Sequence, residues 1–245
     1  MESYFERTIQ LIGDEAVERL AGMHVAVFGL GGVGGYVCEA LARTGVGHLT
    51  LVDNDDVAPS NMNRQIIATA DTIGKPKVAV MSERLLSINP DIKLDVFRMF
   101  YLPENADDID LTVFDYVVDA IDTITAKIEL ITRCIKNDIP IISAMGTGNK
   151  LDPSMLKVSD LSKTHICPLA RVMRRELKKR GIKHVKVVYS EEEPLKRPRE
   201  SENGEDSDVP ALKEHRKDTP ASAVFVPASA GLLIASEIVR DCLSI

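Results

Sequence analysis

Short apolar runs alternate with segments of helical periodicity along most of the chain. The runs at 25–28 and 116–120 are typical of strands buried on both faces of a sheet. Between such runs, apolar residues recur every three or four positions, as Val78, Met81 and Leu85 do in 77–88. This alternation predicts an α/β fold, a Rossmann-like, mainly parallel twisted sheet with helices on both faces.

The same pattern gives the expected order of elements. Strands are expected over 25–28, 48–53, 93–100, 116–120, 139–144, 155–161 and 184–190, and helices over 4–20, 77–88, 123–137, 168–180 and 228–239. We expect one domain over 1–150 and a C-terminal α+β extension over 151–245, continuous with the same globular unit. Residues 191–222 are rich in Glu, Pro, Ser and Lys and cannot bury a core, so a mobile loop is predicted there.

The first strand runs directly into a glycine-rich turn with Gly29, Gly31 and Gly34. Glycine lets a phosphate approach the backbone, and the following helix offers its N-terminal N–H groups and dipole to that phosphate. The second strand ends at Asp53, which suits a ribose hydroxyl. This pattern indicates a nucleotide, most often a nicotinamide or flavin dinucleotide, although a tight strand–helix turn without ligand also produces it.

Polar residues that follow other strands narrow this choice. Arg64 lies in a polar run after the second strand, Lys77 begins a helix, and Asp122 follows a further strand. The carboxyl ends of parallel strands share one edge, so we expect Gly31, Asp53, Arg64 and Asp122 to converge there. Hydride transfer has little use for these charges. Cleavage of a phosphoanhydride needs cations at the phosphoryl oxygens and a carboxylate for Mg²⁺.

Charge and cysteine content exclude other classes. The net charge of −7 excludes a wholly basic nucleic-acid binder, but 171–186 holds eight Lys or Arg and one Glu, a local charge of +7. The four cysteines form no C-x-x-C pair, so no zinc is expected and reduced thiols in the cytoplasm are the simpler interpretation. No secretory signal and no membrane span are expected.

Four motifs together resemble the ThiF/MoeB ubiquitin-activating-enzyme-like adenylating superfamily. They are Gly29-Leu-Gly-Gly-Val-Gly34, Asn61-Met-Asn-Arg-Gln65, Gly74-Lys-Pro-Lys77 and Asp119-Ala-Ile-Asp122. The resemblance implies an ATP-binding adenylating domain. In that domain Asp53 holds the ribose and Asp122 holds Mg²⁺, while Arg64 and Lys77 bind phosphates beside Asn61, Asn63 and Gln65. The glycines implied to lie against ATP are Gly29, Gly31, Gly32 and Gly34. The resemblance also implies a homodimer in which Arg7 enters the neighbour's ATP site.

The second half resembles one branch of that superfamily, the tRNA threonylcarbamoyladenosine dehydratases. The matching segments are 163–170, 187–190 and 227–231. This resemblance implies ATP-dependent ring closure of N6-threonylcarbamoyladenosine in tRNA, with no protein nucleophile and hence no role for Cys167. The basic side chains proposed to contact tRNA are Arg171, Arg174, Arg175, Lys178 and Lys179. A cysteine desulfurase or sulfur-acceptor system is a further partner that the resemblance allows.

Three alternatives stay open at this point. The first is an adenylyltransferase for a ubiquitin-like sulfur carrier, against which the missing C-x-x-C pairs and the basic helix argue. The second is a nucleotide-binding scaffold without catalysis, against which the intact Arg64, Lys77 and Asp122 argue. The third is a nicotinamide dehydrogenase, in which residues 61–65 would have no task.

Overall fold

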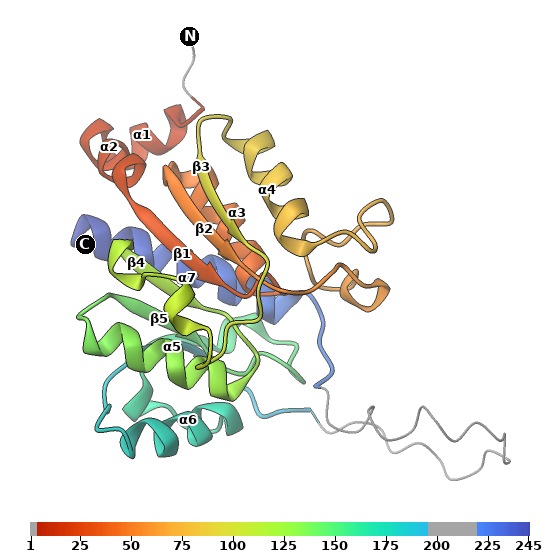
Figure 1. The fold of residues 1–245 in the computed structure, drawn as a ribbon, viewed down its shortest axis with the longest axis vertical. Coiled ribbons are helices and arrows are strands. Elements are labelled where there is room, and N and C mark those ends of the chain that lie inside the picture. The colour runs from red at the N-terminus through yellow and green to blue at the C-terminus, as the bar shows by residue number, and fades with distance from the viewer. Residues whose placement is uncertain (1–3, 196–219) are drawn as a thin grey trace, which may run out of the picture.

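The computed structural model describes residues 4–195 and 220–245, so most of the loop predicted over 191–222 lies outside the described residues. A seven-stranded sheet forms the centre of the described part (Figure 1). Its strands are β1 (His24–Phe28), β2 (His48–Val52), β3 (Lys93–Phe97), β4 (Tyr116–Asp119), β5 (Ile141–Ala144), β6 (Leu156–Asp160) and β7 (Lys186–Ser190). The order is β3-β2-β1-β4-β5-β7-β6, and every neighbouring pair is parallel except β6 with β7.

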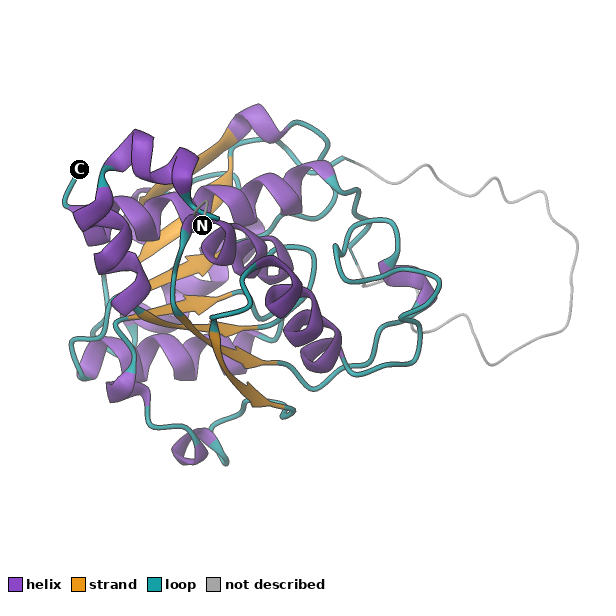
Figure 2. Ribbon diagram, turned by 90° about the horizontal axis from the view of Figure 1, so that it is seen from above, coloured by secondary structure: helices purple, strands orange, loops and turns teal. Residues whose placement is uncertain are grey.

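Helices pack against both faces of this sheet (Figure 2). They are α1 (Glu6–Ile12), α2 (Asp14–Gly22), α3 (Gly34–Thr44), α4 (Lys77–Ile88), α5 (Ile124–Lys136), α6 (Pro168–Lys178) and α7 (Phe225–Leu243). One apolar cluster joins α2, α3, α4 and α7 to the face that carries Val25, Val27 and Leu49. A second joins α5 and α6 to the face that carries Ala26 and Phe28. The predicted α/β class is therefore confirmed.

The N-terminal segment differs from the single helix predicted over 4–20. Gly13 has a φ of +88° and separates α1 from α2. Apolar spacing continues across this point, but a left-handed glycine ends a helix. The apolar spacing alone therefore predicts one helix where the backbone forms two.

The C-terminal part builds onto the same sheet as the N-terminal part. β7 pairs with β5, and β6 then adds an antiparallel edge. α7 lies so close to α3 that a Cβ on Gly231 would stand 2.5 Å from the Val33 carbonyl oxygen. The division at residue 150 stays a prediction, while the sheet and α7 show how tightly the second part adjoins the first.

Candidate active site

The chain turns sharply between β1 and α3. Gly29 has a φ of +90°, and its N–H donates to the Val52 carbonyl oxygen at 2.8 Å. A Cβ on Gly34 would lie 1.8 Å from the Gly29 carbonyl oxygen, so only glycine fits there. The atom nearest to a Cβ on Gly31 is the Gln65 amide nitrogen at 3.9 Å. Two glycines are therefore required by the turn itself, and Gly31 leaves room for a ligand.

Asp53 connects this turn to the loop that follows β2. One carboxylate oxygen accepts the Leu30 N–H at 2.6 Å, and the other accepts the Asp55 N–H at 2.8 Å. The side chain is only 9% exposed. A carboxylate has about four lone-pair positions, so Asp53 keeps acceptor capacity beyond these two bonds. Its place beside the glycine turn is the one predicted from the strand end.

Lys77 is the first residue of α4 and is 5% exposed. Its ammonium lies 2.6 Å from Asp55 Oδ2 and 3.8 Å from Asp53 Oδ1. The Asp55 side chain is 60% exposed, so water can replace Lys77 at that carboxylate. Lys77 is therefore a buried cation whose main partner can be solvated if the ammonium turns toward another anion.

The polar run after β2 folds against the glycine turn. The Arg64 guanidinium donates to the Ser60 carbonyl oxygen at 2.8 Å and to Asn63 Oδ1 at 3.0 Å. Its Cγ lies 3.5 Å from a Cβ built on Gly32. The Asn61 side chain caps the preceding turn by accepting the Ala58 N–H at 3.0 Å. Arg64 thus lies beside the turn, whereas Asn61 shapes the backbone that carries it.

Gln65, whose amide nitrogen is the atom nearest to a Cβ built on Gly31, carries a buried oxygen without a hydrogen-bond partner. The residue is 7% exposed, and its Oε1 has no hydrogen-bond partner among the described residues. A buried amide oxygen without a partner costs about 1–3 kcal/mol. This unpaired acceptor belongs to the side chain whose amide nitrogen is the nearest atom to a Cβ built on Gly31, and it points to a ligand that donates a hydrogen bond to Gln65.

Asp122 lies at the same edge of the sheet, after β4. A Cβ on Gly29 would lie 2.7 Å from the Ala120 carbonyl oxygen, so the loop after β4 touches the glycine turn. Asp122 itself is exposed, and the Thr123 hydroxyl lies 3.4 Å from its Oδ1. Its carboxylate is therefore open to solvent beside the turn, as the strand-end pattern predicts.

A buried ion pair holds the loop that carries Asp122. Lys127 Nζ lies 2.9 Å from Asp119 Oδ2, and both side chains are fully buried. The same ammonium donates to the Ile121 carbonyl oxygen at 3.1 Å, and the Ser143 hydroxyl donates to Asp119 Oδ2 at 2.5 Å. The sequence reasoning missed Lys127. Its signal was a lysine among apolar residues in the first turns of the helix after Asp119.

The segment before α7 crosses this edge of the sheet. Asn63 Nδ2 donates to the Ser222 carbonyl oxygen at 2.7 Å. Farther along the edge, the Ala221 N–H donates to Asn149 Oδ1 at 2.8 Å. The loops after β2 and β5 are thus linked by the chain that leads into α7, and sequence periodicity gave no indication of this link.

Arg7 lies away from these residues within the chain. It is an exposed residue of α1. Phe5, at the start of α1, lies near Gly45, which precedes β2 and therefore marks the amino edge of the sheet. The sheet is roughly 13 Å across between its two edges over five residues. Of the four residues predicted to be catalytic, the chain brings together Arg64, Lys77 and Asp122, and places Arg7 elsewhere.

The basic helix α6 is polar on one side, with a charge distribution that differs in one respect from the prediction. Arg171, Arg175 and Lys178 are exposed. Arg174 was expected to point outward, but its guanidinium donates to the Thr164 carbonyl oxygen at 2.7 Å and is partly buried. Arg174 therefore fastens α6 to the preceding loop, because its guanidinium satisfies the carbonyl oxygen of the buried Thr164.

Glu176 reduces the free charge of this helix further. It is bonded to Lys179 at 2.9 Å and to Arg175 at 3.0 Å. These hydrogen bonds lower the pKa of Glu176, with the Lys179 bond as the largest cause. The side chains of Arg171 and Lys178 form no hydrogen bond or ion pair with residues 4–195 and 220–245, which leaves them free to meet an anion.

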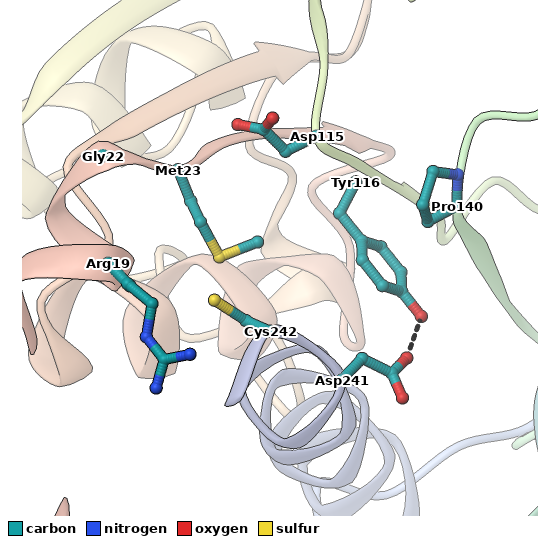
Figure 3. Close-up of a pocket in the computed structure, with 8 residues that line it drawn as sticks. All are labelled: Arg19, Gly22, Met23, Asp115, Tyr116, Pro140, Asp241 and Cys242. Atoms are coloured by element: carbon teal, nitrogen blue, oxygen red, sulfur yellow. Dashed lines mark hydrogen bonds between the residues drawn. The ribbon is translucent and has the colours of Figure 1, made fainter. Parts of the chain in front are cut away.

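A cavity of the described part lies away from this edge. It has a volume of about 620 Å³ and is lined by Arg19, Gly22, Met23, Asp115, Tyr116, Pro140, Asp241 and Cys242 (Figure 3). Met23, Asp115 and Pro140 precede strands, so this cavity opens at the amino edge of the sheet. Hydrogen bonding of the Tyr116 hydroxyl to Asp241 at 2.8 Å closes one side. The nucleotide motifs are at the opposite edge.

The arrangement at the carboxyl edge suits a phosphorylated ligand. Arg64 and Lys77 supply positive charge, Gly31 supplies room, and Asp53 and Asp122 supply carboxylates. Cations held in advance stabilise charge that develops on phosphoryl oxygens, and an open carboxylate is a ligand that Mg²⁺ accepts.

No helix of the described residues is both long and apolar enough to span a bilayer.

Comparison with known proteins identifies the family. The model of the ThiF family matches residues 5–243. The chain belongs to the ThiF family. This ThiF-family protein is 45% identical over 240 residues to the tRNA threonylcarbamoyladenosine dehydratase of Bacillus subtilis (strain 168), with 98% of this chain and 94% of the relative covered. The branch of the superfamily that the second-half motifs indicated is thereby confirmed.

Solved structures agree with this assignment. The crystal structure of E. coli tRNA N6-threonylcarbamoyladenosine dehydratase, TcdA, in complex with AMP matches with a TM-score of 0.86 and 35% identity. The match covers 98% of this chain and 94% of the E. coli chain. The same E. coli protein is also known in complex with ATP. The E. coli sulfur carrier protein ThiS adenylyltransferase is 37% identical over 136 residues, which cover 55% of this chain and 54% of that relative.

Proposed function

We propose that this ThiF-family protein is an ATP-dependent dehydratase of N6-threonylcarbamoyladenosine in tRNA. The observation that carries this proposal is the gathering of Gly31, Asp53, Arg64, Lys77 and Asp122 at one edge of the sheet. Support comes from the relatives that share nearly the whole length of the chain and act on this nucleoside by name. E. coli TcdA, which binds ATP and AMP, supports the choice of nucleotide.

The chemistry requires activation of a carboxylate. A threonyl carboxylate oxygen is a poor leaving group, and transfer of AMP to it from ATP, with release of pyrophosphate, makes it a good one. A nucleophilic atom of the neighbouring carbamoyl group then attacks the carbonyl carbon, AMP departs with the carboxylate oxygen, and a ring closes. The net change in the nucleoside is loss of one water. Both reacting groups belong to one nucleoside, so closure is unimolecular and needs no protein nucleophile.

The side chains divide this work between binding and charge stabilisation. Asp53 holds the ribose with its remaining acceptor capacity, and Gly29, Gly31, Gly32 and Gly34 form the turn that lies against the nucleotide. Arg64 meets phosphate oxygens together with Lys77, which leaves Asp55 when it does so. Asn61 and Asn63 keep the loop in place, and Gln65 Oε1 accepts a hydrogen bond from the ligand. Support comes from the open space at Gly31 and the unpaired Gln65 oxygen.

Asp122 fits a Mg²⁺ ligand. Its carboxylate is exposed and has a single weak side-chain contact at 3.4 Å, so an oxygen is available to a hard cation. A bound Mg²⁺ would neutralise charge on the phosphates. Asp122 would hold the ion next to the glycine turn, and the Asp119–Lys127 ion pair would keep the loop that carries it in position.

The exposed cations of α6 support tRNA contact. The side chains of Arg171 and Lys178 have no partner among the described residues, and Arg175 and Lys179 are both bonded to Glu176. Phosphate attraction by such a patch works on an otherwise acidic protein because the attraction is local and depends on salt. Arg174 contributes by anchoring α6 to Thr164. A cysteine desulfurase or sulfur-acceptor partner and a cytoplasmic location stay predictions from the sequence.

A homodimer is proposed from the position of Arg7. Arg7 belongs to α1, near the amino edge, whereas Asp122 lies at the carboxyl edge. A role for Arg7 in the reaction therefore requires the site of a second copy. Arg7→Ala and Asp122→Ala variants test this role, because a mixed dimer has one site with both residues. Refolding the two together should restore about a quarter of wild-type activity, and no recovery would remove Arg7 from the site.

The decisive experiment is mass spectrometry of nucleosides from tRNA that carries N6-threonylcarbamoyladenosine. The tRNA is incubated with the protein, ATP and Mg²⁺, and Asp122→Ala is compared with the exposed control Asp91→Ala. We expect the nucleoside to lose the mass of one water in an ATP-dependent way, with wild-type and Asp91→Ala alike and Asp122→Ala inactive. Unchanged tRNA together with AMP transfer to the C-terminus of a sulfur carrier would favour the adenylyltransferase alternative.

A further inference from the structure

Two histidines stack at the amino edge of the sheet, away from the candidate active site. His24 begins β1 and His48 begins β2, and the two are partners in the parallel register. Their rings lie 3.4 Å apart between centroids and are inclined by only 5°. Asp95, on β3, lies on the same face of the sheet, because β3 begins at Lys93, the partner of His48. Three neighbouring strands therefore each contribute one metal-ligand side chain to one spot.

The nitrogen atoms of both rings face the same carboxylate oxygen. Asp95 Oδ2 lies 2.8 Å from His48 Nε2 and 3.7 Å from His24 Nε2. Ligands in a tetrahedral site with metal bonds of about 2.0–2.1 Å lie about 3.3 Å from one another. The two Asp95 distances lie on either side of this value, so shifts of about half an ångström would give the carboxylate its ligand spacing. The two rings are stacked almost in parallel, so they would have to rotate apart for their Nε2 lone pairs to converge on one ion.

The surroundings fix these ligands. The His24 backbone N–H donates to Asp115 Oδ2 at 2.8 Å, and the Phe114 ring packs edge-on against the imidazole with centroids 4.8 Å apart. The buried Thr50 hydroxyl lies 2.8 Å from His24 Nε2 and offers an oxygen as a further ligand. Burial lowers the pKa of His24, and the neighbouring His48 lowers it further, with Asp95 and Asp115 opposing. Neutral imidazole is the form that binds metals.

We propose that His24, His48 and Asp95 form a binding site for a divalent transition metal such as Zn²⁺ or Co²⁺. Two imidazoles and one carboxylate suit these borderline ions, whereas Mg²⁺ prefers oxygen ligands only. The fourth position is filled by Thr50 or water. This site is separate from the nucleotide site, and its test does not depend on dehydratase activity.

The experiment titrates the full-length, chelator-treated protein with ZnCl₂ by calorimetry and with CoCl₂ by visible spectroscopy. Nucleotide is left out, and excess MgCl₂ occupies oxygen-only sites. His48→Asn and Asp95→Asn each remove one ligand, and circular dichroism verifies that they are folded. The matched control is His184→Asn, because His184 also faces a carboxylate, Asp160, at 3.2 Å but has no second histidine.

We expect one equivalent of metal, tetrahedral Co²⁺ absorption bands, and at least tenfold weaker binding in His48→Asn and Asp95→Asn. His184→Asn should bind like the wild type. The proposal would be overturned by absence of binding, by equal binding in His48→Asn and the wild type, or by a sulfur-to-cobalt charge-transfer band, which would place the metal on a cysteine.

Discussion

Lys127→Met tests the ion pair beneath the loop that carries Asp122. In the wild type, Lys127 Nζ lies 2.9 Å from Asp119 Oδ2 and donates to the Ile121 carbonyl oxygen at 3.1 Å. Methionine is similar in shape and has no charge, so packing is nearly kept while Asp119 loses its cation. The Ser143 hydroxyl remains as one donor to the carboxylate.

The magnitude follows from complete burial of both groups. Removing one member of a buried ion pair costs about 3–5 kcal/mol, because the other charge stays behind without compensation. For a chain of this length, that corresponds to a fall in Tm of roughly 6–20 °C. An exposed pair provides the control. Arg98 lies 2.8 Å from Asp56, with both side chains about half exposed, and Arg98→Gln should cost about 0–1 kcal/mol.

The assay is urea unfolding of the wild type, Lys127→Met, Arg98→Gln and the double variant Asp119→Asn/Lys127→Met, with ATP binding measured alongside. The double variant removes both charges of this pair and keeps an acceptor for Ser143. It should therefore recover at least half of the stability lost in Lys127→Met. ATP binding should weaken in Lys127→Met and not in Arg98→Gln, since only the former frees Ile121.

Two results would refute this reasoning. One is a Lys127→Met variant as stable as Arg98→Gln, which would mean that water reaches the pair and compensates the charge. The other is a double variant no more stable than Lys127→Met, which would mean that the cost comes from lost packing and not from the unpaired carboxylate. Either result would remove the ion pair as the reason for the position of Asp122.

Three further predictions follow from other contacts. Gly34→Ala should abolish ATP binding and lower the free energy of unfolding by about 1–3 kcal/mol or more through overpacking. The control is Gly22→Ala, where a Cβ meets nothing within 4 Å, and its unfolding free energy from calorimetry should be unchanged or higher. Burial opposes ionisation of Glu39, but hydrogen bonds from its two arginine partners outweigh burial and lower the pKa of Glu39. Ionised Glu39 therefore stabilises the folded protein fully above about pH 4.5, and this contribution is lost as the pH falls below that value. Glu39→Gln should flatten this part of a plot of unfolding free energy against pH. Replacing Arg171 and Lys178 by Gln should weaken tRNA binding and reduce the salt slope by about one per lost phosphate contact, with Arg98→Gln unchanged in filter binding.

Sequence reasoning predicted the edge of the sheet at which the candidate site lies because that edge follows from local patterns. A buried strand, a glycine turn and a polar strand end are each visible within a few residues, and parallel topology then brings Gly31, Asp53 and Asp122 together. The packing reasons for Gly29 and Gly34 were not predicted, since they depend on Ala120 and on the turn's own carbonyl groups.

Contacts between distant segments were beyond these patterns. Arg174 has the same helical spacing as its exposed neighbours, and only the fold shows that Thr164 lies within reach. The antiparallel direction of β6 depends on the path between β5 and β7, which periodicity does not encode. The break at Gly13 does not show in the apolar spacing of the first helices. A residue with a positive φ turns the backbone, but the apolar residues on either side of it keep their spacing along the sequence.

The two edges of the sheet hold polar groups in different ways, and the difference bears on what each can bind. At the carboxyl edge the charges lie on loops or at a helix start, and Lys77 can exchange the exposed Asp55 for another anion. A substrate that is bound, converted and released needs such exchange. At the amino edge His24, His48 and Asp95 lie on hydrogen-bonded strands, whose register fixes their spacing. Rigid spacing suits an ion of constant geometry, so the same sheet supports an adjustable site at one edge and a fixed one at the other.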